Sequence, residues 1–164
     1  TEGATSTHRA GETLRFSTGR RALHDTYTLP LFFCKGETVL LLVTNNEKVR
    51  EKFGSLCTLQ YVEGGHVDVL IHVRDLVHQG HKLLTHPLAG SVKPNETPFR
   101  SVALDDASGA LDLESLELIE AALNVCRQFP PRFHRGEDAP ADMREDFAEI
   151  DFRLIDGAIA PQLQ

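Results

Sequence analysis

The sequence predicts an α/β protein, namely a three-layer α/β/α domain built on a mainly parallel sheet of about four strands. Short apolar runs alternate with amphipathic stretches of helical spacing, a pattern typical of strand and helix units joined by right-handed crossovers. Residues 38–44, TVLLLVT, add a second observation, because an unbroken run of Val and Leu is typical of a strand covered on both faces.

Composition and charge narrow the classes of function. The chain has 164 residues, 41% of them apolar and 25% charged, which suits one globular domain with appended ends. Its formal net charge of -7 argues against a nucleic-acid binder or a binder of anionic membranes. No run is long enough to span a bilayer, and no secretory leader or lipidation signal is visible. We therefore expect a cytoplasmic protein, whose three cysteines, with no CxxC pair, are free thiols.

Three segments are predicted along the chain. Residues 1–37 are polar over most of their length and lack a sustained period, so we expect a partly ordered extension with an edge strand at 29–34. Residues 38–129 carry the alternating pattern and form the α/β domain. Residues 130–164 begin with a proline-containing linker and continue as an acidic C-terminal helix.

The elements that follow the first central strand carry local start and stop signals. NNEKVREKFG predicts a short helix that begins after Asn46 and ends at Gly54. Residues 57–63, CTLQYVE, predict a second strand. Residues 66–79 place apolar side chains on one stripe and predict an amphipathic helix that ends at Gly80.

The second half of the domain is predicted in the same way. HKLLTHP at 81–87 reads as a third short strand, and RSVALD at 100–105 as a fourth. Asp112 can cap a helix that stops at Pro130. A final helix is expected between Asp138, as its cap, and Gly157, with an apolar stripe made of Met143, Phe147, Ile150 and Leu154.

The loop at 85–101, THPLAGSVKPNETPFRS, is the strongest candidate site. Pro94 and Pro98 bracket three polar residues and lower the entropic cost of ordering the loop. Ligands of parallel sheets collect outside the carboxyl ends of strands, where this loop and the residues after the first strand are both expected. The predicted ligand-binding residues are Thr44, Asn45, Asn46, Thr85, His86, Ser91, Lys93, Asn95, Glu96, Thr97 and Arg100.

Catalytic and metal sites are weakly indicated. His86 at a strand end, with Glu96 as partner, is the candidate acid–base pair, although the simpler interpretation is that His86 packs under Pro87 and orients the loop. The helical histidines His66, His72 and His78 are six residues apart and diverge. Only His78 and His81 have a useful spacing, and Gly80 lies between them at the helix end, so we expect no metal site. The phosphate-binding motifs of nucleotide enzymes are absent, so no cofactor is expected.

A resemblance covers roughly residues 38–129. LVTNNEKVREKF, DVLIHVRDLVHQGHKLLTHPLAGSVKPNETPFRSV and LDLESLELIEAAL are similar to the GrdX family, small proteins encoded beside the subunits of glycine, sarcosine and betaine reductase, and residues 81–101 are the most specific part. The resemblance implies a cytoplasmic bacterial protein of anaerobic amino-acid reduction, and no established reaction or ligand comes with it. The chain departs from the family at residues 1–37 and in a tail longer than expected from residue 130 onward.

Three functions are compatible with these observations. The first is a non-catalytic accessory or ligand-binding protein of the reductase system that holds a small anionic ligand or a partner segment at the 85–101 loop. The second is a small enzyme acting on a carboxylate or phosphate substrate at the same loop, with Lys93 and Arg100 clamping the charge. The third is an assembly factor that docks on a glycine or betaine reductase subunit.

Overall fold

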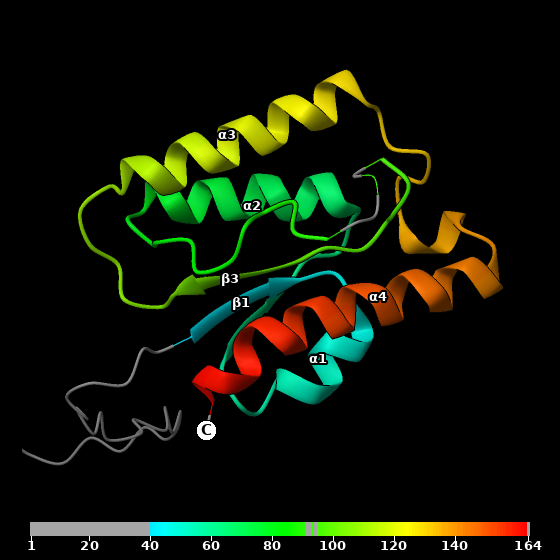
Figure 1. Cartoon of the computed structure of the whole chain (residues 1–164), viewed down its shortest axis with the longest axis horizontal. Coiled ribbons are helices and arrows are strands. Elements are labelled where there is room, and N and C mark those ends of the chain that lie inside the picture. Colours follow the sequence, from blue (N-terminus) through cyan, green and yellow to red (C-terminus); the bar gives the residue numbers. More distant parts are fainter. Residues whose placement is uncertain (1–39, 91–92, 94, 164) are drawn as a thin grey trace, which may run out of the picture. The chain divides into compact units, whose positions relative to one another are not determined.

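The structure is a computed structural model that describes residues 40–90, 93 and 95–163 (Figure 1). The predicted extension 1–37, with its edge strand at 29–34, lies outside the described residues, and so does Ser91 of the candidate loop. The helices and strands are β1 Leu40–Thr44, α1 Glu47–Phe53, β2 Thr58–Tyr61, α2 His66–His78, β3 Ser101–Asp105, α3 Leu113–Gln128 and α4 Ala141–Ile159, with 3₁₀ turns η1 Gly136–Asp138 and η2 Ala160–Gln162.

The sheet is smaller than predicted, and it is mixed. Its described strands lie in the order β2-β1-β3, with β2 parallel and β3 antiparallel to β1. The register pairs Thr44 with Ser101, so β3 starts where β1 ends. The α/β class is confirmed, whereas a mainly parallel sheet of four strands is not. Burial on both faces explains the Val and Leu run of β1, but burial does not encode the direction of a neighbouring strand.

The segment predicted as the third strand, residues 81–87, does not become a strand. It pairs with β3 at one isolated bridge between Leu83 and Leu104, where Leu84 N donates to the carbonyl of Ala103 (2.9 Å) and Asp105 N donates to the carbonyl of Lys82 (2.8 Å). The N–H of Leu83 donates to Ser115 Oγ (2.9 Å), and the hydroxyl of Thr85, in place of a backbone carbonyl, accepts an N–H of β3 (2.9 Å). The ladder stops there because the hydroxyl of Thr85 takes the N–H of Ala103, which a backbone carbonyl would accept in a continuous strand.

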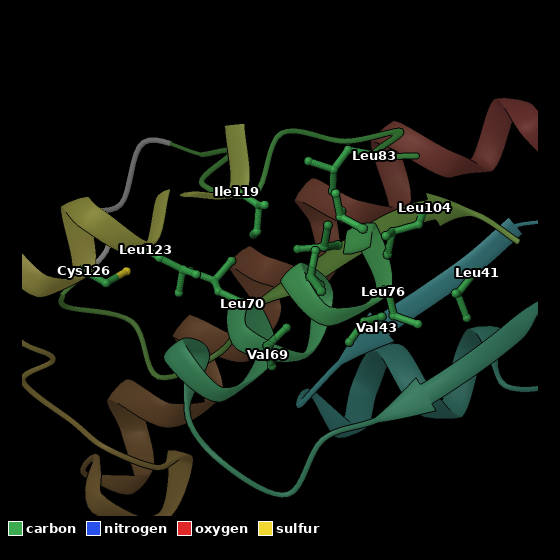
Figure 2. Close-up of a cluster of buried hydrophobic side chains, with 13 residues drawn as sticks. Leu41, Val43, Val69, Leu70, Leu76, Leu83, Leu104, Ile119, Leu123 and Cys126 are labelled. Atoms are coloured by element: carbon green, nitrogen blue, oxygen red, sulfur yellow. The ribbon is translucent and has the colours of Figure 1, made fainter. Parts of the chain in front are cut away.

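Helices cover both faces of the sheet. On one face, Leu41 and Val43 of β1 pack in a hydrophobic cluster with α2 and α3, and Figure 2 shows Leu123 and Cys126 of α3 beside Leu70 of α2. On the other face, Leu40 and Leu42 pack with residues of α1 and α4. Because side chains alternate along β1, this strand contributes residues to two hydrophobic cores, which is why nearly every residue of the strand is apolar.

Local signals define the first three helices. The side chain of Asn46 accepts from Lys48 N (3.1 Å) and caps α1, as predicted. Asp112 caps α3 by accepting from Ser115 N (2.9 Å). Gly80 follows α2 with a φ of 95°, where a side chain would also overlap the backbone of Gly109.

The last helix has a different phase from the predicted one. It begins at Ala141 after Pro140, and Asp138 instead accepts from Arg135 N (2.9 Å) in the preceding turn. It runs past Gly157 to Ile159. The side chains that face inward are those of Ala148, Asp151, Ile155 and Ile159. Of the predicted stripe, Ile150 and Leu154 are each 40% exposed. The helix is turned so that the carboxylate of Asp151 reaches the polar end of the sheet. No helix in the described part of the chain is long and apolar enough to cross a membrane.

Candidate functional site

Polar side chains are buried where β1 ends and β3 begins. Thr44 Oγ1 and Ser101 Oγ lie 2.7 Å apart, and Ser101 Oγ donates to Asp151 Oδ2 (2.7 Å). The amide of Asn46 donates to Asp151 Oδ2 (3.0 Å) and to the carbonyl of Ala148 (2.8 Å). We call Thr44, Asn46, Ser101 and Asp151 the Asp151 cluster. It fastens α4 to the sheet through hydrogen bonds between residues that are distant in the sequence.

Charge in the Asp151 cluster is controlled by burial. Burial raises the pKa of Asp151, although the hydrogen bonds from Asn46 and Ser101 and the charge of Arg100 act in the opposite direction. Burial also lowers the pKa of Arg100, against the nearby Asp151 carboxylate. The two groups support each other's charge, but each loses more from leaving water than it gains from its partner.

Asn45, which follows β1, connects its own loop by hydrogen bonds to the loop after β2 and to the 85–101 loop. Its amide donates to the carbonyls of Gly64 and Pro98 (both 2.9 Å), and its Oδ1 accepts from Arg100 N (2.8 Å). The predicted ligand-binding residues after β1 therefore already have partners within the protein. They position the surrounding chain, and Asn45 and Asn46 also line a cavity described below.

The described residues of the 85–101 loop also use polar groups within the loop. His86 Nδ1 accepts from Leu88 N (3.1 Å), and Thr97 Oγ1 accepts from the N–H of Phe99 (3.3 Å). Arg100 donates from Nη1 to the carbonyl of Ala89 (2.9 Å). Thr97 and Arg100 are buried, Asn95 and Glu96 half-buried and Lys93 exposed. Ligand binding by this loop stays a prediction.

A cavity of about 680 Å³ lies outside the carboxyl ends of the parallel strands β1 and β2. We call it the β1–β2 cavity. Its position agrees with the general rule for α/β sheets. Asn45 and Asn46 contribute from the end of β1 and Tyr61 from the end of β2, while Arg135 and Arg144 reach it from the segment before α4 and from α4 itself.

The walls of the β1–β2 cavity carry both signs of charge. The cations are Lys48, Arg135 and Arg144, and the carboxylates are Glu47, Glu63, Glu137 and Glu145. Arg144 Nη2 donates to the carbonyls of Glu137 and Ala139 (both 3.1 Å), while its buried Nε has no partner among the described residues. Tyr61 Oη donates to the carbonyl of Asn45 (3.3 Å), and burial raises the pKa of this phenol. The cavity can therefore hold a carboxylate and a cationic group together.

A second cavity, of about 460 Å³, lies between α2 and α3, and we call it the α2–α3 cavity. The segment that follows α3 borders both cavities, since Arg135 lines each of them, and it contacts the start of α2, where a Cβ at Gly65 would overlap the carbonyl oxygen of His134. His66 lines this cavity and is 1% exposed. Among the described residues no group of three or more His, Cys, Asp or Glu is arranged to hold a metal ion.

Of the predicted ligand-binding residues, Asn45 and Asn46 line the β1–β2 cavity, and sequence reasoning missed the other residues that line the two cavities. His66 was considered only as a metal ligand, while Tyr61, Arg135 and Arg144 raised no signal. They belong to different elements and share no motif, so only the folded chain brings them together. His86 and Glu96, the predicted acid–base pair, line neither large cavity.

Comparison with known proteins identifies the family. GrdX-like proteins match residues 41–160, so the match extends beyond the domain predicted from the sequence and includes the linker and α4. Comparisons with curated proteins and with solved structures find no match. The tail from residue 130 is thus part of the family's length rather than a departure from it. The chain belongs to the family of GrdX-like proteins.

Proposed function

We propose that this protein is a non-catalytic accessory protein of the glycine, sarcosine or betaine reductase system and that it binds a small molecule in the β1–β2 cavity. The family membership supports the metabolic context. The observation that carries the binding role is the cavity of about 680 Å³ at the carboxyl ends of two parallel strands, with charges of both signs in its walls.

The composition of the walls favours a ligand with a carboxylate and a cationic nitrogen over a simple anion. Arg135 and Arg144 can pair with the carboxylate, since guanidinium groups match its geometry. Glu63 and Glu137 offer carboxylates to the cationic end, and Tyr61 adds an aromatic ring. A small amino acid or its N-methylated derivative has these features.

The described lining of this cavity lacks three of the common catalytic residue types, which is consistent with a binding role. Among the described residues that line the β1–β2 cavity there is no serine, cysteine or histidine to act as a nucleophile or as an imidazole base. An enzyme working at the 85–101 loop would instead lose its rate in His86→Ala while the protein still folds. An assembly factor would bind a reductase subunit, and no small molecule would bind in its cavities.

Binding is tested by thermal shift and calorimetry with glycine, sarcosine and betaine, using acetate and tetramethylammonium as half-ligands. A ligand at a hundred times its dissociation constant adds about 2.7 kcal/mol to the free energy of unfolding. We expect the zwitterions to stabilise the protein and each half-ligand to bind at least about tenfold more weakly, because one ionic contact is lost.

Two variants of α4 locate the site. Arg144→Gln should weaken zwitterion binding by about tenfold or more, because a charge-assisted hydrogen bond contributes about 1.5–3 kcal/mol. Arg153→Gln is the matched control, since Arg153 is an exposed arginine of the same helix that pairs with Glu149 (2.7 Å) and does not line the cavity. Equal losses in both variants, or no binding of any zwitterion to the wild type, would refute the proposed ligand class.

A further inference from the structure

The α2–α3 cavity differs in chemistry from the β1–β2 cavity. Its walls combine apolar side chains, among them Ile71, Leu123 and Pro130, with three arginines. Leu123 and Cys126 also belong to the hydrophobic cluster on this face of the sheet, so the cavity borders the core. A volume of about 460 Å³ falls in the range of small-molecule sites.

A buried histidine in this cavity has unused hydrogen-bonding capacity. His66 is the first residue of α2 and is 1% exposed, yet neither Nδ1 nor Nε2 finds a partner among the described residues. Burial, with the charge of Arg100 nearby, lowers the pKa of His66 to about 4, although Asp68 acts in the opposite direction. At neutral pH the ring is uncharged and offers one N–H donor and one acceptor. Leaving such groups unpaired in the interior is costly, so a ligand that pairs with the ring gains affinity.

The charges around the cavity favour an anion. Arg74 is paired with Asp75 (2.9 Å), but within the described part of the chain no carboxylate lies within ion-pair distance of Arg127 or Arg135. Asp68 is the carboxylate in the lining, and its Oδ2 accepts from Gly65 N (2.8 Å) at the start of α2. Arg127 and Arg135, without an acidic partner among the described residues, therefore border the same cavity as His66, and Arg135 also lines the β1–β2 cavity.

We propose that the α2–α3 cavity binds a small organic anion with an apolar body, such as an aliphatic carboxylate, whose head accepts a hydrogen bond from His66 and faces Arg127, while its chain contacts Ile71 and Leu123. The apolar walls disfavour inorganic phosphate, which has no apolar body. The excess of arginine over carboxylate disfavours the zwitterions of the β1–β2 cavity. The two cavities would then serve different ligands.

The test is calorimetry on the full chain with hexanoate as probe, and with hexanol, hexylamine and inorganic phosphate as comparison molecules. We expect hexanoate to bind at least about tenfold more tightly than hexanol, because the head group adds a charge-assisted hydrogen bond. We expect hexylamine and phosphate to bind still more weakly. Equal affinity for hexanoate and hexanol, or no binding of hexanoate, would overturn the proposal.

Variants and a spectroscopic readout locate the anion. Arg127→Gln, at the exposed end of α3, should weaken hexanoate binding about tenfold without unfolding the protein, and Arg153→Gln should leave it unchanged. In the long-range ¹H–¹⁵N spectrum of histidine rings, hexanoate should shift the nitrogen signals of His66. If hexanoate binds and the His66 signals do not shift, then hexanoate lies elsewhere and the proposal is overturned. Arg144→Gln should leave hexanoate binding intact, which separates this site from the proposed function.

Discussion

The protein buries polar side chains in two places that differ in how completely hydrogen bonds satisfy them. In the Asp151 cluster, the carboxylate accepts from both Asn46 and Ser101, and the helix that carries it packs on one face of the sheet. His66 belongs to α2 on the other face, and its ring nitrogens have no partner among the described residues. Unsatisfied buried polar groups are rare and costly, so the satisfied region acts as a structural fastening, and the unsatisfied one is where we propose a binding site.

Arg100 links the two regions. Its charge acts on the pKa of Asp151 and on the pKa of His66, in both cases downward. One buried cation therefore stabilises the ionised carboxylate on one side and the neutral imidazole on the other. Substitutions in either region should change the free energy of unfolding, by amounts that differ between the two.

The largest effect should come from breaking the satisfied region. Asp151→Ala removes the acceptor shared by Asn46 and Ser101 and leaves the buried Arg100 without its carboxylate. We expect the free energy of unfolding to fall by about 1–3 kcal/mol for each buried donor that loses its acceptor. Urea unfolding measures it. A loss below about 1 kcal/mol would mean that the cluster does not fasten α4.

The next effect is a pH dependence that originates in the unsatisfied region. The pKa of His66 is about 4 in the folded protein, whereas its ordinary value is 6.5. Between these two pH values the unfolded chain is protonated at His66 and the folded protein is not. The contribution of His66 to the free energy of unfolding is fully present above pH 6.5 and is lost as the pH falls toward 4. The loss approaches about 3 kcal/mol.

Comparing the wild type with His66→Leu isolates the contribution of His66, because both proteins contain all the other titrating groups. The raised pKa of Asp151 has the opposite sign, because its stabilising contribution is present at low pH and is lost as the pH rises through the raised value. Urea unfolding across the pH range should show a steeper acid loss in the wild type than in His66→Leu. Parallel curves would contradict a depressed pKa for His66.

A smaller effect is expected at the wall between the cavities. A methyl group at Gly65 would overlap the carbonyl of His134, so Gly65→Ala should displace the segment that follows α3. Forced overpacking costs about 1–3 kcal/mol. Gly157→Ala is the control, since nothing lies within 4 Å of its Cβ and a helical alanine is about 1 kcal/mol better than glycine. Thermal unfolding of both should move in opposite directions.

The smallest effect concerns the exposed ion pairs between α1 and α4. Lys52 Nζ lies 2.7 Å from Asp156 Oδ1, and both side chains reach solvent. A double-mutant cycle with Lys52→Ala and Asp156→Ala should give a coupling below about 1 kcal/mol, and salt should reduce it. A coupling as large as the Asp151→Ala effect would show that buried hydrogen bonds are not what distinguishes the cluster.

Local sequence signals predicted elements whose causes are local. The caps at Asn46 and Asp112 and the glycine after α2 lie within a few residues of the ends they define, and the structure agrees with each. The predicted face of α4 was wrong because a hydrophobic stripe ignores Asp151, a polar residue buried through hydrogen bonds to distant parts of the chain. The third strand was wrong for a related reason, since the side chain of Thr85 takes the N–H of Ala103 that a strand would bind through its backbone.

By itself the sequence determined the α/β class, the family and the positions of most helices and strands, because periodicity, caps and glycines act over a few residues. Only the tertiary structure decided the direction of β3, the phase of α4 and the composition of the two cavities. Strand direction follows from the path of the chain between strands. His66 and Arg135 border one cavity where the segment after α3 contacts the start of α2, and that contact, between Gly65 and His134, joins residues almost seventy positions apart.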